Sequence, residues 1–327
     1  MVPGRGPDVK GSPSFSFIIV CFNNRALLPS CIDSIRQTVE RPLYEIIVSD
    51  NGSTDGSDRL IREQWPDIHL IENGKNLGFA AAVNRGIAAA RGDYIVLMNS
   101  DARLTPGALE TIGRFMDDHP DVAIAGGRLI DPDGSPQNSA AAFPGMATEF
   151  GLKPLLKILF PRRFPGSGAG RRDPFDVDSI IGALMVARVG AVRHVGGLDE
   201  DYFFFLEETD WCLRMKRAGM RVVVVPEARI IHDQGKTAKR YPLRAKVEYY
   251  RSLVTFMEKN RGRLYRAAFV GGLAIRFSVD ILLQALMCCA TLFIARAPRE
   301  RCKRYAGLLL WVVLGRPASW GLSGINQ

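Results

Sequence analysis

Two strand-like runs of this 327-residue chain end in aspartates. Asp50 follows YEIIVS, and Asp101 ends LMNSD. In an open α/β sheet, ligands bind outside the carboxyl ends of the strands. A carboxylate there can accept a hydrogen bond from a uracil or thymine N3–H or a ribose hydroxyl, and one beside a diphosphate can bind Mg²⁺ or Mn²⁺. The alternatives are structural: Asp50 forms an Asx turn in DNGS, and Asp101 caps a helix near Pro106.

The segment NLGFAAAVNRG forms a loop that leads into a helix of small residues. Its polar and flexible positions are Asn76, Gly78 and Asn84. The side-chain amides and the bare glycine backbone would allow close approach of a nucleotide. The alternative is that Gly78 and the alanines only permit close packing of the helix on a sheet.

Three acids, Glu207, Glu208 and Asp210, begin the helical segment LEETDWCLRMKRAG. Acids at a helix start also complement the helix dipole, which is the structural alternative. However, the preceding Tyr202–Leu206 is apolar and aromatic. Apolar and aromatic surroundings raise the pKa of a carboxyl group toward the range of a general base.

His232 ends the strand-like run VVVVPEARIIH. It is a metal ligand, a base or a buried histidine with hydrogen-bond partners. Its place after the acidic segment favours the metal ligand.

Strand-like runs alternate with segments of helical composition, which predicts an α/β fold with a mostly parallel sheet flanked by helices. The Gly/Pro-rich sequence between Leu129 and Val177 predicts functional loops or lids, with a short helix at Leu152–Phe160. The expected strands are Phe15–Cys21, Tyr44–Ser49, Ile68–Glu72, Tyr94–Met98, Val122–Ala125, Ala183–Ala187 and Val222–Val225, and the expected helices include Leu27–Val39, Phe79–Arg91, Pro106–Asp118 and Lys246–Asn260.

The six cysteines form no CxxC pair, so we expect reduced thiols and neither a disulfide framework nor a zinc site. Residues 1–14 are rich in Gly and Pro without an apolar run, which predicts a flexible leader and not a signal peptide.

The formal charge of +9 belongs to the C-terminal part, where 17 Lys/Arg face four acids from Lys236 onward. These basic residues flank apolar stretches, a pattern that favours an anionic membrane surface over nucleic acid. None of the stretches reaches the roughly 18 to 20 clean apolar residues of a spanning helix, because Arg276 and Asp280 interrupt the longest. We therefore expect monotopic or re-entrant attachment.

The segments VCFNN, DNGSTDGS, NLGFAAAVNRG, LMNSDA, GALMVAR and EExD together resemble family 2 glycosyltransferases of GT-A fold over about Phe15 to Gly235. Within this family, the arrangement at Gly196–Arg214 most resembles bacterial rhamnosyltransferases of cell-surface polysaccharide assembly. The resemblance implies inverting transfer of a sugar from a nucleotide diphosphate donor to a hydroxyl, assisted by Mg²⁺ or Mn²⁺.

The resemblance also implies residue roles. Glu208 is the catalytic base, in place of the family's usual Asp, and Asn99 replaces the first acid of the DxD-type motif. Asp101 and His232 hold the metal. Glu207, Asp210 and Trp211 contact the acceptor or support the base, and the nucleotide-sugar site contains Cys21, Phe22, Asn23, Asp50, Asn76, Gly78, Asn84, Ser100 and Asp101.

We thus expect a leader at 1–14, a GT-A catalytic domain at 15–240 and a helical membrane-associated region at 241–327, on the cytoplasmic face of the inner membrane. TDP-rhamnose leads as donor, ahead of galactofuranose, N-acetylglucosamine and mannose donors. The expected acceptor is a lipid-linked saccharide or a polysaccharide. The sequence is also compatible with a homo-oligomer. The alternatives are a non-catalytic sugar-nucleotide-binding partner and a nucleotidyltransferase, while an NAD-binding Rossmann enzyme lacks its GxGxxG motif.

Overall fold

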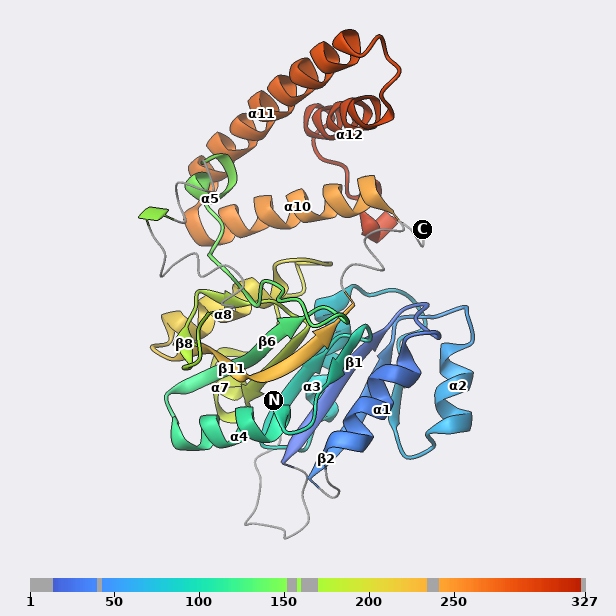
Figure 1. Cartoon of the computed structure of the whole chain (residues 1–327), viewed down its shortest axis with the longest axis vertical. Coiled ribbons are helices and arrows are strands. Elements are labelled where there is room, and N and C mark those ends of the chain that lie inside the picture. The colour runs from blue at the N-terminus through green and yellow to red at the C-terminus, as the bar shows by residue number, and fades with distance from the viewer. Residues whose placement is uncertain (1–13, 40–42, 152–157, 160–169, 234–240, 325–327) are drawn as a thin grey trace. The chain divides into compact units, whose positions relative to one another are not determined.

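The computed structural model describes residues 14–39, 43–151, 158–159, 170–233 and 241–324 (Figure 1). The expected leader and most of the expected helix at Leu152–Phe160 lie outside these residues. The chain forms two compact units. The first contains the described residues up to Phe143, between Pro154 and Glu200, and from Glu207 to Lys236.

The first unit is built on one large sheet with the strand order β3-β2-β1-β4-β10-β6-β11-β5, and β8 pairs with β11. Strands β1 to β4, β6 and β11 run in one direction, because β10 is antiparallel to both β4 and β6. Their carboxyl ends therefore meet at one edge, called the carboxyl edge below. The strands are β1 (Phe15–Cys21), β2 (Tyr44–Asp50), β3 (His69–Glu72), β4 (Tyr94–Met98), β5 (Ala102–Leu104), β6 (Val122–Ile130), β8 (Phe175–Asp176), β10 (Leu184–Arg188) and β11 (Arg221–His232).

Helices cover both faces of this sheet because its central strands are apolar on both sides. Phe17 and Ile19 of β1 face a core shared with α1, α2 and α4, whereas Ile18 faces a second core shared with α3, α7 and α8. Figure 1 shows α1 and α4 in front of the sheet and α3 and α7 behind it. These helices are α1 (Leu28–Thr38), α2 (Ser57–Gln64), α3 (Phe79–Ala89), α4 (Ala108–Asp118), α7 (Val189–Val195) and α8 (Glu207–Arg217).

The mostly parallel sheet flanked by helices confirms the predicted fold class, and β1 and β4 have the predicted bounds. The structure adds three antiparallel pieces, β5, β8 and the small pair β7 (Ala140–Ala141) with β9 (Ser179–Ile180). Strand β11 is also much longer than the predicted Val222–Val225. Its last three residues pair with β5, and this pairing brings His232 opposite Ala102.

The second unit is helical and contains α10 (Pro242–Arg261), α11 (Arg263–Ala290), α12 (Arg296–Val313) and two short 3-10 helices, Ala318–Trp320 and Leu322–Gly324. It also includes two segments from earlier in the chain, Pro144–Lys153 with α5 (Met146–Phe150), and Asp201–Leu206. The hydroxyl of Ser252 donates to the carbonyl of Phe204 at 2.8 Å, and the rings of Phe150 and Phe269 lie 5.3 Å apart. A hydrogen bond and an aromatic contact thus attach the two segments to α10 and α11.

Candidate active site

Asp101 and His232 lie together at the carboxyl edge. Nε2 of His232 is 3.4 Å from Oδ1 of Asp101, and both side chains are largely buried. The N–H of Asp233 donates to the carbonyl of Asp101 at 2.9 Å, which joins the two strand ends. Nδ1 of His232 lies 3.2 Å from Oε1 of Gln137, which fixes the ring orientation from the other side.

The geometry of this pair fits two neighbouring ligands of one hexacoordinate cation. Ligand oxygens lie about 2.1 Å from Mg²⁺, so adjacent ligands lie roughly 3 Å apart. Within the described residues no group of three or more His, Cys, Asp or Glu side chains is arranged to hold a metal. A cation here would therefore take its remaining ligands from donor phosphates and water, as Mg²⁺ usually does.

The structure removes one alternative for Asp101. Helix α4 begins at Ala108, after Gly107, and no side chain caps it by a hydrogen bond. The hydroxyl of Thr105, directly before Pro106, donates instead to the carbonyl of Arg229 at 2.8 Å. Asp101 consequently has no capping role at α4.

Asp50 is the last residue of β2, and its carboxylate bonds to the turn that follows it. Its carboxylate accepts hydrogen bonds from the N–H groups of Gly52 and Ser53, at 3.1 and 3.0 Å, and from the Ser53 hydroxyl at 2.5 Å. This geometry matches the structural alternative, an Asx-type turn. A carboxylate has four acceptor positions, so a contact to a nucleobase stays a prediction.

The loop after β1 is tied to the same turn. The N–H of Asn23 donates to the Ser53 hydroxyl at 2.9 Å, and its side-chain oxygen accepts from the N–H of Thr54 at 2.8 Å. Asn23 adopts a positive φ of 54°, a conformation that asparagine tolerates. Phe22 is half-buried, whereas the thiol of Cys21 is fully buried in the core, where burial raises its pKa to about 11. Cys21 can thus offer a ligand only its backbone.

An amide network joins the ends of β2 and β3 to the start of α3. The buried Asn51 donates to the carbonyl of Gly78 at 3.0 Å and to Oδ1 of Asn76 at 3.3 Å, and accepts from Asn73 at 2.9 Å. Oδ1 of Asn76 also accepts from the Gly78 N–H at 3.0 Å. The network holds Asn76 and Gly78 beside Asn51. Sequence reasoning missed Asn51 and Asn73, although Asn51 directly follows Asp50.

Asn84 bonds to a different part of the protein. Its amide donates to the carbonyl of Leu198 and to the Glu200 carboxylate, both at 2.8 Å, and its oxygen accepts from the Leu198 N–H at 2.9 Å. A Cβ on Gly197 would lie 2.3 Å from that oxygen. Asn84 thus anchors the loop before α8, and its contact with the nucleotide stays a prediction.

Glu208, in the first turn of α8, lies beside Gly182, just before β10. A Cβ on Gly182 would lie 3.6 Å from Cγ of Glu208, and the carbonyl of the next residue, Ala183, accepts from the N–H of Asn99 at 3.0 Å. In the same loop, the Ser100 hydroxyl and the side-chain amide of Asn24 are hydrogen-bonded at 2.8 Å. Glu208 is thus linked through Gly182 and Ala183 to the loop that carries Ser100 and Asp101.

The other members of the acidic segment hold α8 in place. Asp210 is buried and pairs with Arg214 at 2.7 Å, and Arg214 also donates to the carbonyl of Gly197 at 2.7 Å. Trp211 is fully buried in the second core, and its indole N–H donates to the carbonyl of Gly196 at 2.9 Å. Glu207 is buried as well. Because Tyr202–Leu206 belongs to the second unit, the expected effect of this aromatic segment on the pKa of Glu208 stays a prediction.

Known proteins resemble this chain in sequence and fold. N-acetylglucosaminyl-diphospho-decaprenol L-rhamnosyltransferase of Mycobacterium tuberculosis is 28% identical over 279 residues, which cover 79% of this chain and 90% of that protein. The mannosyltransferase PcManGT of Pyrobaculum calidifontis, solved with GDP-Man and Mn²⁺, superposes with a TM-score of 0.56 at 17% identity and covers 95% of this chain and 89% of its own.

A third relative is the glucosyl-3-phosphoglycerate synthase of Mycobacterium tuberculosis, solved with Mn²⁺ and uridine diphosphate. It superposes with a TM-score of 0.51 at 17% identity, covering 75% of this chain and 79% of its own. Residues 16–194 match the family described as Glycosyl transferase family 2. The chain therefore belongs to glycosyl transferase family 2, where it lies close to bacterial rhamnosyltransferases, and it is a hexosyltransferase of GT-A fold.

Proposed function

We propose that this enzyme is an inverting, divalent-cation-dependent glycosyltransferase that transfers a sugar from a nucleotide diphosphate donor to a hydroxyl of a polyprenyl diphosphate-linked saccharide. The observation that carries the proposal is the Asp101–His232 pair at 3.4 Å, with Glu208 beside Gly182, whose neighbour Ala183 bonds to the loop that carries Asp101. The similarity to a decaprenol-linked rhamnosyltransferase supports rhamnose, from TDP-rhamnose, as the sugar. Cell-surface polysaccharide synthesis is the corresponding process.

In the mechanism, Asp101 and His232 would hold Mg²⁺ or Mn²⁺, which when bound supplies positive charge against the donor diphosphate. Glu208 takes the proton of the attacking acceptor hydroxyl on its carboxylate. The acceptor oxygen bonds to the sugar C1 as the C1–O bond to the diphosphate breaks, and one in-line displacement inverts the configuration at C1. Asp210 and Arg214 keep α8, and with it Glu208, at the site.

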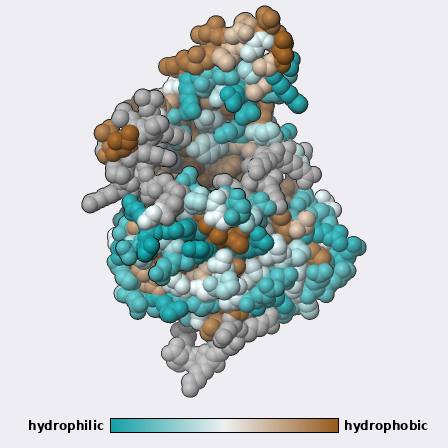
Figure 2. Space-filling model, in the orientation of Figure 1, coloured by the Kyte–Doolittle hydropathy of each residue, from teal (hydrophilic) through white to brown (hydrophobic). Residues whose placement is uncertain are grey.

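The second unit would bind the cytoplasmic face of the membrane as a monotopic hairpin of α11 and α12. Helix α11 is long and apolar enough to cross a membrane, and most of its apolar stretch is not buried within the protein. It is longer than the apolar runs we expected from the sequence. Figure 2 shows hydrophobic residues gathered on this helical unit. By length and composition, spanning and surface-lying arrangements are both open to α11.

Two features favour the surface-lying arrangement. Arg276 in the middle of α11 donates to the carbonyl of Glu149 at 2.6 Å, within the same unit. Helix α12 packs against α11 and begins with a basic run, so crossing would place that run in or beyond the bilayer. In a hairpin that lies in the interface, the basic side chains reach the anionic headgroups while the apolar residues enter the acyl region.

The decisive experiment compares the wild type with Glu208→Gln, using a panel of nucleotide sugars, Mn²⁺ or Mg²⁺, and membrane lipid extract as acceptor. We expect turnover of one donor and a loss of about 10²- to 10⁴-fold in kcat in the variant, because Gln cannot accept the proton. Donor binding, measured by calorimetry, should be retained. Arg217→Gln, an exposed substitution at the end of the same helix, is the control. Equal turnover in wild type and Glu208→Gln would contradict the assignment of the base.

A further inference from the structure

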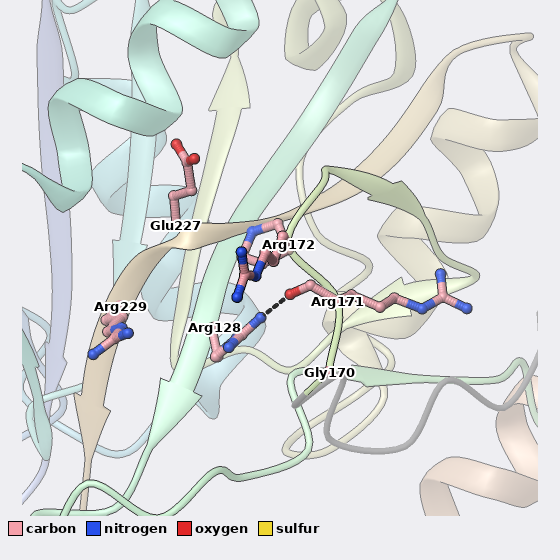
Figure 3. Close-up of a pocket in the computed structure, with 7 residues that line it drawn as sticks. Arg128, Gly170, Arg171, Arg172, Glu227 and Arg229 are labelled. Carbon is pink, nitrogen blue, oxygen red and sulfur yellow. Dashed lines mark hydrogen bonds between the residues drawn. The ribbon is translucent and has the colours of Figure 1, made fainter.

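The first unit contains an arginine-lined hollow that is separate from the Asp101–His232 pair. It has a volume of about 620 Å³ and is lined by Arg128, Gly170, Arg171, Arg172, Pro226, Glu227 and Arg229. Four of these seven residues are arginines and one is acidic, so the lining has an excess of positive charge. Figure 3 shows Arg128 and Arg172 within this hollow and Glu227 pointing away from both.

The hollow results from an irregularity in β11. The register between β11 and β6 shifts between Val225 and Arg229, so Pro226, Glu227 and Ala228 have no partners in the ladder. Gly127 makes this possible, because a Cβ there would lie 2.4 Å from the carbonyl oxygen of Ala228. The bulge is therefore specified by the sequence, and bulges commonly redirect side chains next to active sites.

The irregularity brings like charges together. Beyond it, Arg229 of β11 pairs directly with Arg128 of β6. Like charges opposite one another on neighbouring strands destabilise a sheet. Arg172 comes from another segment of the chain, and within the described residues neither Arg172 nor Arg229 forms an ion pair with an acid. Such a grouping is unfavourable for the isolated protein and favourable once an anion binds.

Two of the arginines make contacts within the protein. Arg128 donates to the carbonyl of Arg171, and the Arg171 guanidinium lies 4.4 Å from the centre of the Phe175 ring. In Figure 3 the Arg171 side chain points away from the other three. Arg172 and Arg229 can therefore bind a ligand together with Arg128, whose guanidinium has five N–H donors and can donate to a ligand as well as to the carbonyl of Arg171.

The position of the hollow relates it to the reaction. Arg229 precedes His232 by three residues on β11, which is about 10 Å along a strand. Leu129 and Ile230 face the core shared with α1 and α4, so their neighbours Arg128 and Arg229 lie on the opposite face, which α8 covers. The hollow thus shares a strand with His232 and a sheet face with the helix that carries Glu208.

We propose that Arg128, Arg172 and Arg229 bind the diphosphate of the lipid-linked acceptor. This proposal rests on the proposed function and extends it, because it assigns separate sites to the donor and acceptor diphosphates. Guanidinium groups bind phosphate oxygens in a bidentate manner, and several arginines match the charge of a diphosphate. The hollow has the size typical of small-molecule sites. Binding there would hold the acceptor saccharide near Glu208.

The kinetic test uses full-length Arg128→Gln, Arg172→Gln and Arg229→Gln, with a polyprenyl diphosphate-linked saccharide and with an alkyl glycoside of the same sugar that lacks the diphosphate. We expect each variant to raise the KM for the diphosphate acceptor by about tenfold, the loss of one charge-assisted hydrogen bond. The KM for the donor and the rate with the alkyl glycoside should not change. Arg193→Gln is the matched control, because this exposed arginine follows β10 at the opposite edge of the sheet.

A raised donor KM would assign the hollow to the donor and overturn the proposal, as would an equal loss with both acceptors or no loss with either. Binding to phosphatidylglycerol vesicles without acceptor separates a lipid headgroup from the acceptor. If Arg128→Gln weakens vesicle binding as much as it raises the acceptor KM, the ligand is the headgroup and the proposal is wrong.

A binding measurement separates this proposal from the proposed function. Calorimetry with inorganic pyrophosphate, without divalent cation, is performed on the wild type, Arg128→Gln/Arg172→Gln and Arg193→Gln. We expect binding to be lost only in the double variant. If no donor is turned over but this loss is observed, the proposed function fails and the diphosphate site stands. If transfer proceeds but the double variant binds pyrophosphate like the wild type, the site fails and the function stands.

Discussion

Asp101 and His232 are separated by more than 130 positions in the chain, yet they meet because β5 and β11 pair at the end of the sheet. One carboxylate and one imidazole are a small ligand set. The affinity for a cation would therefore depend strongly on each of them and on the donor diphosphate. The hydrogen-bonded Gln137 restrains the ring, as partners of metal-binding histidines usually do.

We predict that Asp101→Asn and His232→Gln each raise the Mn²⁺ concentration for half-maximal activity by more than about tenfold. Loss of a residue that only hydrogen-bonds to a metal ligand already lowers metal affinity by about tenfold or more, so loss of a ligand itself should have at least this effect. Titration of activity with Mn²⁺ at saturating donor measures this. Asp67→Asn is the control, because Asp67 forms a partly exposed ion pair with Arg36. An unchanged Mn²⁺ requirement in both variants would refute the proposed ligand set.

Glu248 of α10 supports a prediction about pH. Burial raises its pKa above the ordinary 4.5, partly opposed by Arg251 and the backbone of Ser323. The folded state thus favours the protonated acid, and the stability from this group is lost as pH rises through the raised pKa. Glu248→Gln stays neutral, so its melting temperature relative to wild type should increase with pH above 4.5. Thermal unfolding of both proteins from pH 4 to 8 tests this, and a constant or decreasing difference would contradict it.

At the scale of elements, the sequence predicted the parallel strands well because their apolar runs are continuous. It missed β5 because three residues, ARL, carry no pattern of their own. The strand predicted for β11 ended too early, before Pro226 and Glu227. These two residues resemble a strand end in the sequence but form a bulge within a longer strand. The sequence placed Glu208 in the first turn of a helix and Asp101 just after a strand, as in the structure, whereas the hydrogen bonds of Asn84 and Arg214 depend on segments distant in sequence.

The contact between α3 and β1 leads to an element-scale prediction. A Cβ on Gly86 would lie 2.5 Å from Cγ2 of Ile18, whereas a Cβ on Gly190 in α7 would meet no atom within 4 Å. We expect Gly86→Ala to destabilise the protein by roughly 1 to 3 kcal/mol through overpacking. Gly190→Ala, the matched control, should be neutral or stabilising by up to about 1 kcal/mol because alanine favours helix. Urea unfolding measures both, and a stable Gly86→Ala variant would show that α3 moves freely on β1.

At the scale of the whole molecule, the two units divide the properties of the sequence between them. The first unit contains the site residues, and the second contains most of the basic tail and the exposed apolar residues. Sequence alone did not reveal that Asp201–Leu206, directly before Glu207, groups with the second unit, because grouping of this kind depends on contacts with α10. The chain thus passes from the proposed membrane-binding unit directly into the helix that carries the proposed base.

The turn between α11 and α12 has the features of a membrane-inserting tip. Leu292, Phe293 and Ile294 are 78%, 57% and 79% exposed, and Leu292 and Phe293 adopt positive φ angles that apolar side chains rarely occupy. Arg296 and Arg299 follow directly at the start of α12. Exposed apolar residues beside arginines are suited to an interface of acyl chains and anionic headgroups.

We predict that the triple variant Leu292→Asn, Phe293→Asn, Ile294→Ser loses binding to phosphatidylglycerol-containing vesicles by on the order of 10³-fold or more, because each buried apolar side chain contributes about 1.5 to 3 kcal/mol. The fold should persist, since asparagine tolerates a positive φ. Leu264→Ser, at the other end of α11 and 89% exposed, is the control. Co-sedimentation measures binding, and transfer to a water-soluble acceptor should be unaffected. Because a spanning α11 would hold the protein in membranes regardless of the tip, unchanged membrane association of the triple variant in cells would favour a span over a monotopic hairpin.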